Sequence, residues 1–364
     1  MTWESMSVAD HPYKNLADSA YWRRSVAAAG AAVDPIVGDF PRIKQTDKVA
    51  TAGSCFAQHV ARHLAASGFT YLVTESAHPY VPAQAAREAG YGVYSARYGN
   101  IYTTLQLVQL FDRAYGTFAP QEDVWRAPDG QHFVDPFRPT IQPGGFASER
   151  EMRADREQHL ARVRAMFETL DLLVFTLGLT EAWVSKADGA AFPLCPGVAG
   201  GSFDPHAHEF RNLRTKDVRQ QIEAFAARLR GVNPAARIIL TVSPVPLAAT
   251  ASGNHVLPAT LYSKSVLRAA AQEAADDLDG VFYFPSYEIV TGPQARGRFF
   301  AEDLREVTEE GVEQVMRIFL RHAAGADRPV SVSTPEAAGG HGLDTRVSAW
   351  VETLCDEAML DERD

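Results

Sequence analysis

Five runs of mainly apolar residues along the chain have the length and composition of β-strands. They are rich in β-branched, aromatic and leucine residues and show no alternation with polar ones, which is typical of strands covered on both faces of a parallel sheet. The runs are 47–52, 69–75, 171–178, 237–243 and 281–284.

Segments with apolar residues at helical spacing lie between most of these runs. Thr103 or Thr104 is suited to cap a helix that continues through Tyr115. The other predicted helices are 58–64, 148–170, 215–229, 263–275 and 310–322. Because strands and helices alternate, the pattern predicts an α/β fold, in which an open parallel sheet carries helices on both faces.

Segments without periodicity divide the chain. Residues 1–46 predict an irregular arm that wraps the domain formed by residues 47–323. Two long insertions rich in proline or glycine interrupt this domain, at about 118–147 and 184–213. The second insertion is long and has no clear structure, which indicates a lid or a pocket wall.

Composition and charge limit the class of partner. The chain has 364 residues, 46% of them hydrophobic and 22% charged, and it can bury a large core. Its formal net charge of −10 argues against binding to nucleic acid or to an anionic membrane, because both require a basic patch. We expect a small or neutral ligand. The tail, 324–364, contains a short amphipathic helix at 347–359 that could dock on the domain or form a homodimer with a second copy.

Cysteine usage and the N-terminal sequence predict a cytoplasmic protein without a cofactor. The three cysteines, Cys55, Cys195 and Cys355, lack the spacing of a disulfide framework or a zinc site. The N-terminus has no signal-peptide pattern, and no apolar run is long enough to span a membrane. A metal site with His206 and His208 is the least favoured hypothesis, because their spacing is a weak signal.

A Gly-Ser step lies where the first predicted strand meets the first helix of the domain. Gly53 permits a tight turn, and the helix N-terminus would offer N–H groups to a developing negative charge beside Ser54. This is a suitable setting for a nucleophile, although serine also commonly caps helices. Cys55 is an alternative nucleophile, because helix N-termini activate thiolates, but a buried packing role is favoured for it.

Two further polar clusters lie at predicted element ends. Gly99 and Asn100 come just before the helix that follows Thr103. Thr180 and Glu181 follow the strand 171–178, at the edge where open α/β sheets bind ligands, or they form a loop turn and helix cap.

The run Thr-Ala-Gly-Ser-Cys-Phe-Ala at 51–57 resembles the motif of the GSCFA family, which is similar to the SGNH (GDSL-like) hydrolase superfamily. Further strings of the family follow in the same order, and the similarity covers about residues 45–320. The strings are 98–103, 135–139, 178–183, 243–246 and 262–265.

The resemblance implies a three-layer αβα fold with a flavodoxin-like parallel sheet and Ser54 as the nucleophile. It also implies oxyanion donors, which would be the N–H of Ser54 and a group from Gly99 or Asn100. The string at 178–181 reads Gly-Leu-Thr-Glu where the superfamily usually has Gly-x-Asn-Asp. Thr180 therefore replaces the asparagine donor and Glu181 the aspartate, and Asn100 could take over as donor.

The general base departs further from the superfamily pattern. An Asp-x-x-His pair is usual before the last helix, and here the string is Asp303-Leu-Arg-Glu306. A histidine from another loop could serve, oriented by Asp303 or Glu306; His255 is favoured, His208 comes next, and His59 is also near in sequence. Alternatively, a desolvated Glu306 acts alone, or the site binds without turnover.

Two other conspicuous residues could line the pocket. Arg138 could clamp an anion and Trp183 could form an apolar wall, but structural roles are favoured for both. In those roles Arg138 ties its loop to a carboxylate such as Asp135, and Trp183 is a core residue.

The sequence thus predicts a serine esterase that acts on a small-molecule or carbohydrate ester through an acyl-Ser54 intermediate. One alternative is an O-acyltransferase, in which a sugar or metabolite hydroxyl replaces water as the acceptor. Another is a catalytically impaired ligand-binding protein that keeps the pocket without the base.

Overall fold

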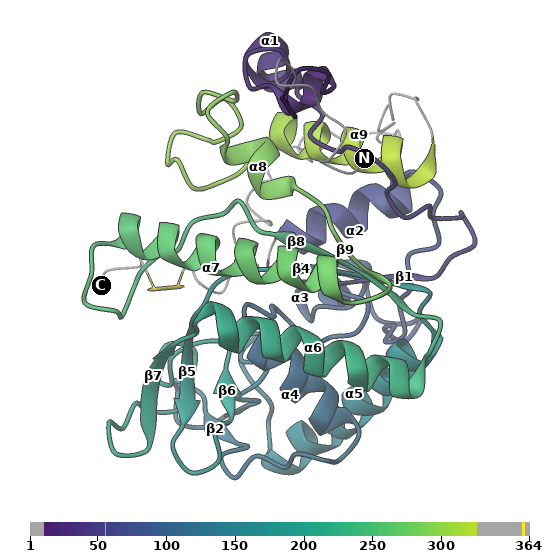
Figure 1. Cartoon of the computed structure of the whole chain (residues 1–364). Coiled ribbons are helices and arrows are strands. Elements are labelled where there is room, and N and C mark those ends of the chain that lie inside the picture. The colour runs from purple at the N-terminus through teal and green to yellow at the C-terminus, as the bar shows by residue number, and fades with distance from the viewer. Residues whose placement is uncertain (1–10, 55, 326–358, 361–364) are drawn as a thin grey trace, which may run out of the picture.

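A four-stranded parallel sheet forms the centre of the computed structural model, which describes residues 11–54, 56–325 and 359–360 (Figure 1). The strands lie in the order β1-β4-β8-β9, and every neighbouring pair is parallel. Their bounds are β1 Val49–Gly53, β4 Leu172–Leu177, β8 Arg237–Val242 and β9 Val281–Tyr283. The residues of β1 and β4 are all buried, as the uninterrupted apolar runs predict.

Helices cover both faces of this sheet, which confirms the predicted α/β architecture (Figure 1). On one face, β4 packs through Val174 against a cluster that includes Phe56 and Phe319. That face carries α2 (Phe56–Ala66), α8 (Ser286–Thr291) and α9 (Glu309–Ala324). The other face carries α4 (Thr104–Ala114), α5 (Glu149–Thr169), α6 (Thr215–Val232) and α7 (Val256–Asp277).

Capping residues fix the helix starts. Thr103 accepts a hydrogen bond from the N–H of Gln106 in a capping box, and Ser148 caps α5. Helix α7 begins at Val256, seven residues before the predicted start, because the ring of His255 accepts the N–H of Leu257. Pro258 is compatible with this start, since the first turn of a helix needs no N–H donor there.

The predicted strand at 69–75 is wrong. Only an isolated bridge joins Tyr71 to Val49. Two residues after Val49 in β1, the backbone of Thr51 bonds to a different segment. Its N–H donates to Ser95 Oγ at 3.1 Å, and its carbonyl accepts from the Tyr98 hydroxyl. The loop that contains Ser95 and Tyr98 therefore covers the edge of β1 in place of a strand.

The two insertions contain short strands, so the prediction that the second lacks structure is wrong. The first insertion holds the antiparallel pair β2 (Trp125–Arg126) and β3 (Phe133–Val134). The second contributes to a three-stranded antiparallel sheet in the order β6-β5-β7, with bounds β5 Glu181–Ser185, β6 Ala191–Phe192 and β7 His208–Asn212. Strands this short, separated by glycine and proline turns, leave little periodic signal in the sequence.

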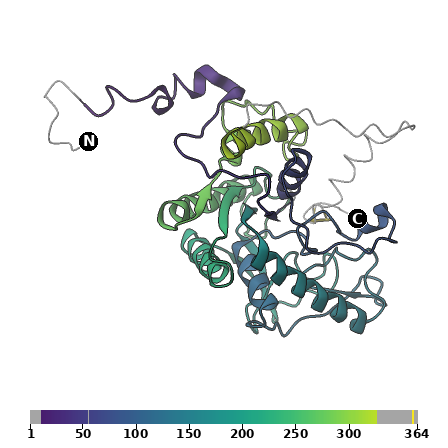
Figure 2. The ribbon, with the colours of Figure 1, turned by 90° about the vertical axis from the view of Figure 1, so that its right-hand side faces the viewer.

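The N-terminal segment lies beside α9 from α1 (Val26–Ala29) onward, whereas the described residues before α1 extend away from the domain, as Figure 2 shows. Asp34 pairs with Arg321 and His322 of α9, and the N–H of Ile43 donates to the Ala323 carbonyl at 2.8 Å. The short helices of the N-terminal segment are η2 (Asp18–Ala20), α1 (Val26–Ala29) and η3 (Gly30–Ala32), and α3 (Ala83–Glu88) lies further along the chain.

Within the described residues, no helix has the length and apolar character needed to cross a membrane. The predicted tail helix lies outside the described residues except for residue 359.

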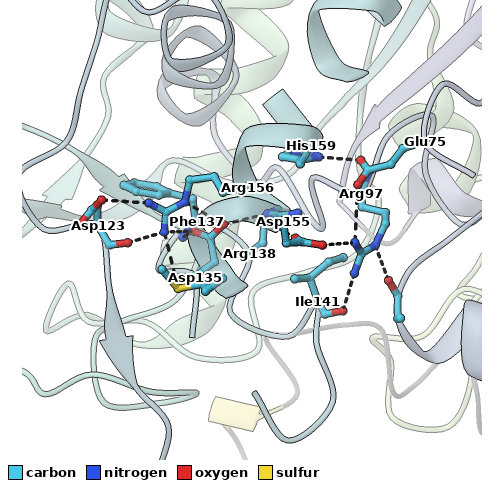
Figure 3. Close-up of polar contacts among 12 residues, drawn as sticks. Glu75, Arg97, Asp123, Asp135, Phe137, Arg138, Ile141, Asp155, Arg156 and His159 are labelled. Carbon is cyan, nitrogen blue, oxygen red and sulfur yellow. Dashed lines mark hydrogen bonds and ion pairs between the residues drawn. The ribbon is translucent and has the colours of Figure 1, made fainter. Parts of the chain in front are cut away.

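A buried ion cluster connects α5 to three loops (Figure 3). Arg138 donates to Asp135 at 2.9 Å and to Asp155 of α5 at 2.7 Å, which confirms the structural role that the sequence favoured for it. Arg97 binds the same Asp155 at 2.8 Å, and its N–H donates to Glu75 at 2.8 Å. The cluster thereby fixes the loop that covers β1.

Replacing Arg138 should destabilise the folded protein, because it leaves the carboxylate of Asp135 buried without its main partner. We expect Arg138→Met to lower the free energy of unfolding by about 3–5 kcal/mol. The matched control is Arg298→Met, which breaks an exposed pair with Glu310 and should change the stability far less, because water screens that pair. Urea unfolding measures both, and an Arg138→Met protein as stable as the control would contradict a structural role.

Acid should destabilise the protein through His159, whose ring lies 2.7 Å from Glu75 in the cluster. Burial lowers the pKa of His159 from 6.5 to about 4, and the charge of Arg138 adds to this effect. The unfolded chain takes up this proton at a higher pH than the folded chain. The stability that His159 contributes is therefore full above pH 6.5 and falls as the pH drops towards 4, by about 3 kcal/mol at most.

Urea unfolding above and below pH 6.5 tests this dependence. Burial opposes ionisation of Glu75, but the hydrogen bond from His159 prevails and lowers its pKa to about 2, so Glu75 adds to the loss only below pH 4.5. The variant His159→Asn keeps a donor for Glu75 but does not titrate, and it should show a flatter decline between pH 6.5 and 4.5. An equally steep decline in this variant would exclude His159 as the cause.

Candidate active site

Four chain segments and one helix meet at the carboxyl ends of the parallel strands. Parallel α/β sheets bind ligands at this edge. A small cavity lies between them, with about 10 Å³ of space, and we call it the Ser54 cavity. Its lining consists of Ser54, Tyr102, Gly178, Leu179, Ser243, residues 245–247 and Lys264. Space of this size holds about one water molecule.

The turn from β1 to α2 is possible only because residue 53 is glycine. Gly53 has a φ of 138°, and a Cβ atom there would lie 2.3 Å from the Thr176 carbonyl oxygen of β4. The next N–H, that of Ser54, is directed at the same oxygen at 3.4 Å. In this arrangement the Ser54 N–H faces a protein carbonyl, unlike the oxyanion role predicted for it.

The Ser54 side chain is buried, and its hydroxyl has no hydrogen-bond partner among the described residues. A capping serine would accept an N–H from the first turn of α2, and here the N–H of Ala57 donates to the Ser54 backbone carbonyl at 2.9 Å. Ser54 Oγ therefore does not cap the helix. Buried hydroxyls are normally bonded, so this one calls for an explanation. Cys55, the alternative nucleophile, lies outside the described residues.

The loop before α4 brings Asn100 to this turn. The N–H of Ile101 donates to the Gly53 carbonyl at 2.9 Å. The side-chain oxygen of Asn100 accepts from Tyr94 at 3.2 Å and from Gln58, in the first turn of α2, at 3.5 Å. Gly99 has a φ of 69°, the left-handed conformation that lets the loop turn here. Of the predicted oxyanion residues, Asn100 and Gly99 thus belong to a loop that is bonded to the turn before Ser54, but Asn100 lines a second small cavity with Tyr98 and Ile101 and is not part of the lining of the Ser54 cavity.

Gly178 forms the opposite side of the turn. A Cβ atom on Gly178 would lie 3.0 Å from the Tyr102 carbonyl oxygen and 3.4 Å from the Ser54 Cβ. The N–H groups of Gly178 and Leu179 both donate to that Tyr102 carbonyl, at 3.0 and 3.1 Å. The ends of β1 and β4 and the loop before α4 therefore form one tightly packed junction.

Thr180 and Glu181 are used within the protein. The Thr180 hydroxyl donates to Asn212 Oδ1 at 2.6 Å and its N–H to Ser263 Oγ at 2.9 Å, so its donors are engaged, contrary to the predicted oxyanion role. Glu181 accepts from Thr250 Oγ1 at 2.5 Å and thereby fixes the loop after β8. Both residues make these contacts because β5 begins at Glu181, so the chain enters the second sheet here.

The histidines proposed as bases lie elsewhere. His255 is an exposed cap at the start of α7. His208 is buried between Glu122, 2.8 Å from its Nε2, and the Asp204 N–H, 3.1 Å from its Nδ1. His208 begins β7 and Asn212, the residue that Thr180 contacts, ends it, so the two are about 13 Å apart along the strand. Burial lowers the pKa of His59 to about 3, and Arg62 donates to its Nδ1.

The remaining predicted residues also lie outside the lining of the Ser54 cavity. Asp303 and Glu306 belong to an exposed turn before α9, in which Asp303 accepts two backbone N–H groups. Trp183 packs against Phe203 and Phe210 on the second sheet, with ring centroids 5.2 and 5.6 Å away. The described residues contain no group of three possible metal ligands.

The sequence analysis gave no role to Lys264, which lines the Ser54 cavity. Its side chain is only 2% exposed, and Nζ donates to the Gly178 carbonyl at 2.6 Å. The signal was present in the helical pattern, because Lys264 shares the buried face of α7 with Leu267 and Ala271. A charged residue on an apolar stripe indicates either a buried pair or a functional site.

One known family matches most of the chain. The model of the GSCFA family matches residues 48–319, which is more than half of the chain. The chain belongs to the GSCFA family. All residues that line the Ser54 cavity fall within the region that matches the GSCFA family. No curated protein matched the sequence.

Substituting Gly53 should be severely destabilising. We expect Gly53→Ala to lower the free energy of unfolding by at least about 3 kcal/mol, because both its backbone angle and the contact with Thr176 exclude a side chain. Gly130→Ala is the control: φ is also positive, 69°, but a Cβ atom would meet nothing within 4 Å, and the cost should be about 1 kcal/mol. Equal urea midpoints for the two variants would contradict the tight junction.

Proposed function

We propose that this protein transfers acyl groups through Ser54, as a serine esterase acting on a small-molecule or carbohydrate ester. One observation carries the proposal. Ser54 Oγ is removed from water at the carboxyl end of β1 and has no hydrogen-bond partner among the described residues. An unbonded buried hydroxyl costs stability, and catalysis is a common reason for such an arrangement.

The finer placement, among SGNH-like hydrolases, is part of the same proposal. The bridge at Tyr71 lies on the edge of β1 away from β4, so the order along the sheet is Tyr71 segment-β1-β4-β8-β9. This corresponds to the flavodoxin-like order 2-1-3-4-5 with a degenerate second strand. The order supports the superfamily resemblance of the motifs at 51–57 and 178–183.

In the proposed reaction Ser54 Oγ attacks the ester carbonyl, and the oxygen of the tetrahedral intermediate gains negative charge. We assign donation to this oxygen to the side chain of Asn100, whose loop is bonded to the same turn through the N–H of Ile101. Such a donor contributes about 2.7–4 kcal/mol to catalysis. The acyl-Ser54 ester is then released to water, or to a hydroxyl acceptor if the protein is an O-acyltransferase.

Substrate access requires movement, because the Ser54 cavity is no larger than one water molecule. Its outer wall includes Val245 and Pro246, which are partly exposed in the loop after β8. Displacement of this loop would give a substrate access to the Ser54 hydroxyl. A closed site of this kind keeps water from competing during acyl transfer.

A fluorophosphonate probe followed by mass spectrometry of the labelled peptide tests the function. We expect the wild-type protein to be labelled on Ser54 and Ser54→Ala to be unlabelled. Ser67→Ala is the matched control at the other end of α2, where the hydroxyl donates to the His63 carbonyl, and it should be labelled like wild type. Labelling on Cys55, or none in the wild-type protein, would contradict the proposal.

A further inference from the structure

Lys264 is the titratable side chain that α7 brings to the Ser54 cavity. It is among the largest fully buried side chains of the described chain, and Nζ lies 2.6 Å from the Gly178 carbonyl oxygen. Gly178 in turn lies against Ser54, since a Cβ atom on it would be 3.4 Å from the Ser54 Cβ. Lys264 and Ser54 therefore line the same small cavity.

The lining of the Ser54 cavity narrows the choice of base. Among the described residues that form it, Tyr102 and Lys264 are the titratable ones, and there is no aspartate, glutamate or histidine. A tyrosine hydroxyl is a weak proton acceptor because it is almost fully protonated near neutral pH. Lysines removed from water serve as general bases in other enzymes, because burial disfavours their charged form.

The position of Lys264 is fixed from its own helix and from the sheet. The neighbouring residue Ser263 accepts the N–H of Thr180 at 2.9 Å, which ties α7 to the segment directly after Gly178. Thr180, whose hydroxyl is engaged elsewhere, is thus a positioning residue for α7. Lys264 is therefore placed by its own bond to Gly178 and by the bond between its neighbour Ser263 and Thr180, and it lines the same cavity as Ser54.

We propose that Lys264 is the general base that removes the proton from Ser54, so that a serine–lysine pair operates where related enzymes use histidine. The inference rests on the proposed acyl-transfer function. The transfer is direct or passes through one water molecule, which is all that the Ser54 cavity can hold.

The proton balance of the reaction is as follows. The lone pair of Lys264 Nζ takes the Ser54 proton while Oγ bonds to the acyl carbon and the carbonyl π pair moves to oxygen. That pair returns, the ester C–O bond breaks, and the leaving alkoxide takes the proton from Nζ. Water or an acceptor hydroxyl then attacks the acyl-enzyme, gives its proton to Nζ, and Ser54 Oγ recovers that proton on release.

The rate of fluorophosphonate labelling at Ser54, measured from neutral to alkaline pH, tests Lys264. Lys264→Met removes the amine, and Lys264→Arg keeps a charge but has no usable base. Both should be labelled at least about 100-fold more slowly than wild type. The matched control is Lys186→Met, because Lys186 also donates to a backbone carbonyl, that of Pro205, and should be labelled at the wild-type rate.

The outcomes separate the two proposals. Unlabelled wild-type protein overturns acyl transfer and with it the role of Lys264. If wild type is labelled and Lys264→Met is labelled as fast, Lys264 is not the base, while the function stands. Recovery of the rate in Lys264→Arg would show that a charge is sufficient, and would likewise overturn the general base.

If both Lys264 variants fail to fold, as circular dichroism would show, the pH dependence of labelling provides a second test of the base. The labelling rate of the wild-type protein should rise with pH through one ionisation, and His255→Ala should show the same profile. Loss of that profile in His255→Ala would assign the base to the histidine and overturn the proposal.

Discussion

The close approach of β1 and β4 at their carboxyl ends is the constraint on which the site depends. Gly53 and Gly178 leave no room for side chains between the two strand ends. This absence lets the backbone of Ser54 lie against Thr176, and lets the loop before α4 bond to both strand ends. A side chain at either glycine would separate the segments that carry Ser54, Asn100 and the wall of the Ser54 cavity.

The buried ion cluster also fixes the loop before α4, which it contacts through Arg97. Buried ion pairs contribute little net stability, because desolvation offsets their attraction. Here Asp155 of α5 holds Arg97 and Arg138 together, and Arg97 belongs to the segment that ends in Asn100. We infer that these ion pairs serve mainly to position the loop before α4. The ion cluster fixes the start of this loop, and the junction of β1 and β4 fixes its end.

Much of the fold was readable from the sequence, because strands buried on both faces leave uninterrupted apolar runs. The run at 69–75 has the same composition, but it did not form a strand because Ser95 and Tyr98 took the hydrogen-bonding groups of Thr51. Competition of this kind between distant residues leaves no local pattern.

The site was predicted in part for a similar reason. The Gly-Ser step and Asn100 lie at element ends, which local patterns locate well. Thr180 follows a strand end too, but the start of β5 engages its hydroxyl with Asn212. Lys264 comes from a helix remote in sequence, and only the packing of α7 on the sheet brings it to Ser54.

A crystal structure of the protein after reaction with a fluorophosphonate would test the central claim most directly. The account predicts a bond between Ser54 Oγ and phosphorus, with a phosphonyl oxygen within hydrogen-bond distance of Asn100 and with Lys264 Nζ beside the adduct. A structure in which Ser54 is unmodified, or in which the adduct lies away from both Asn100 and Lys264, would contradict it.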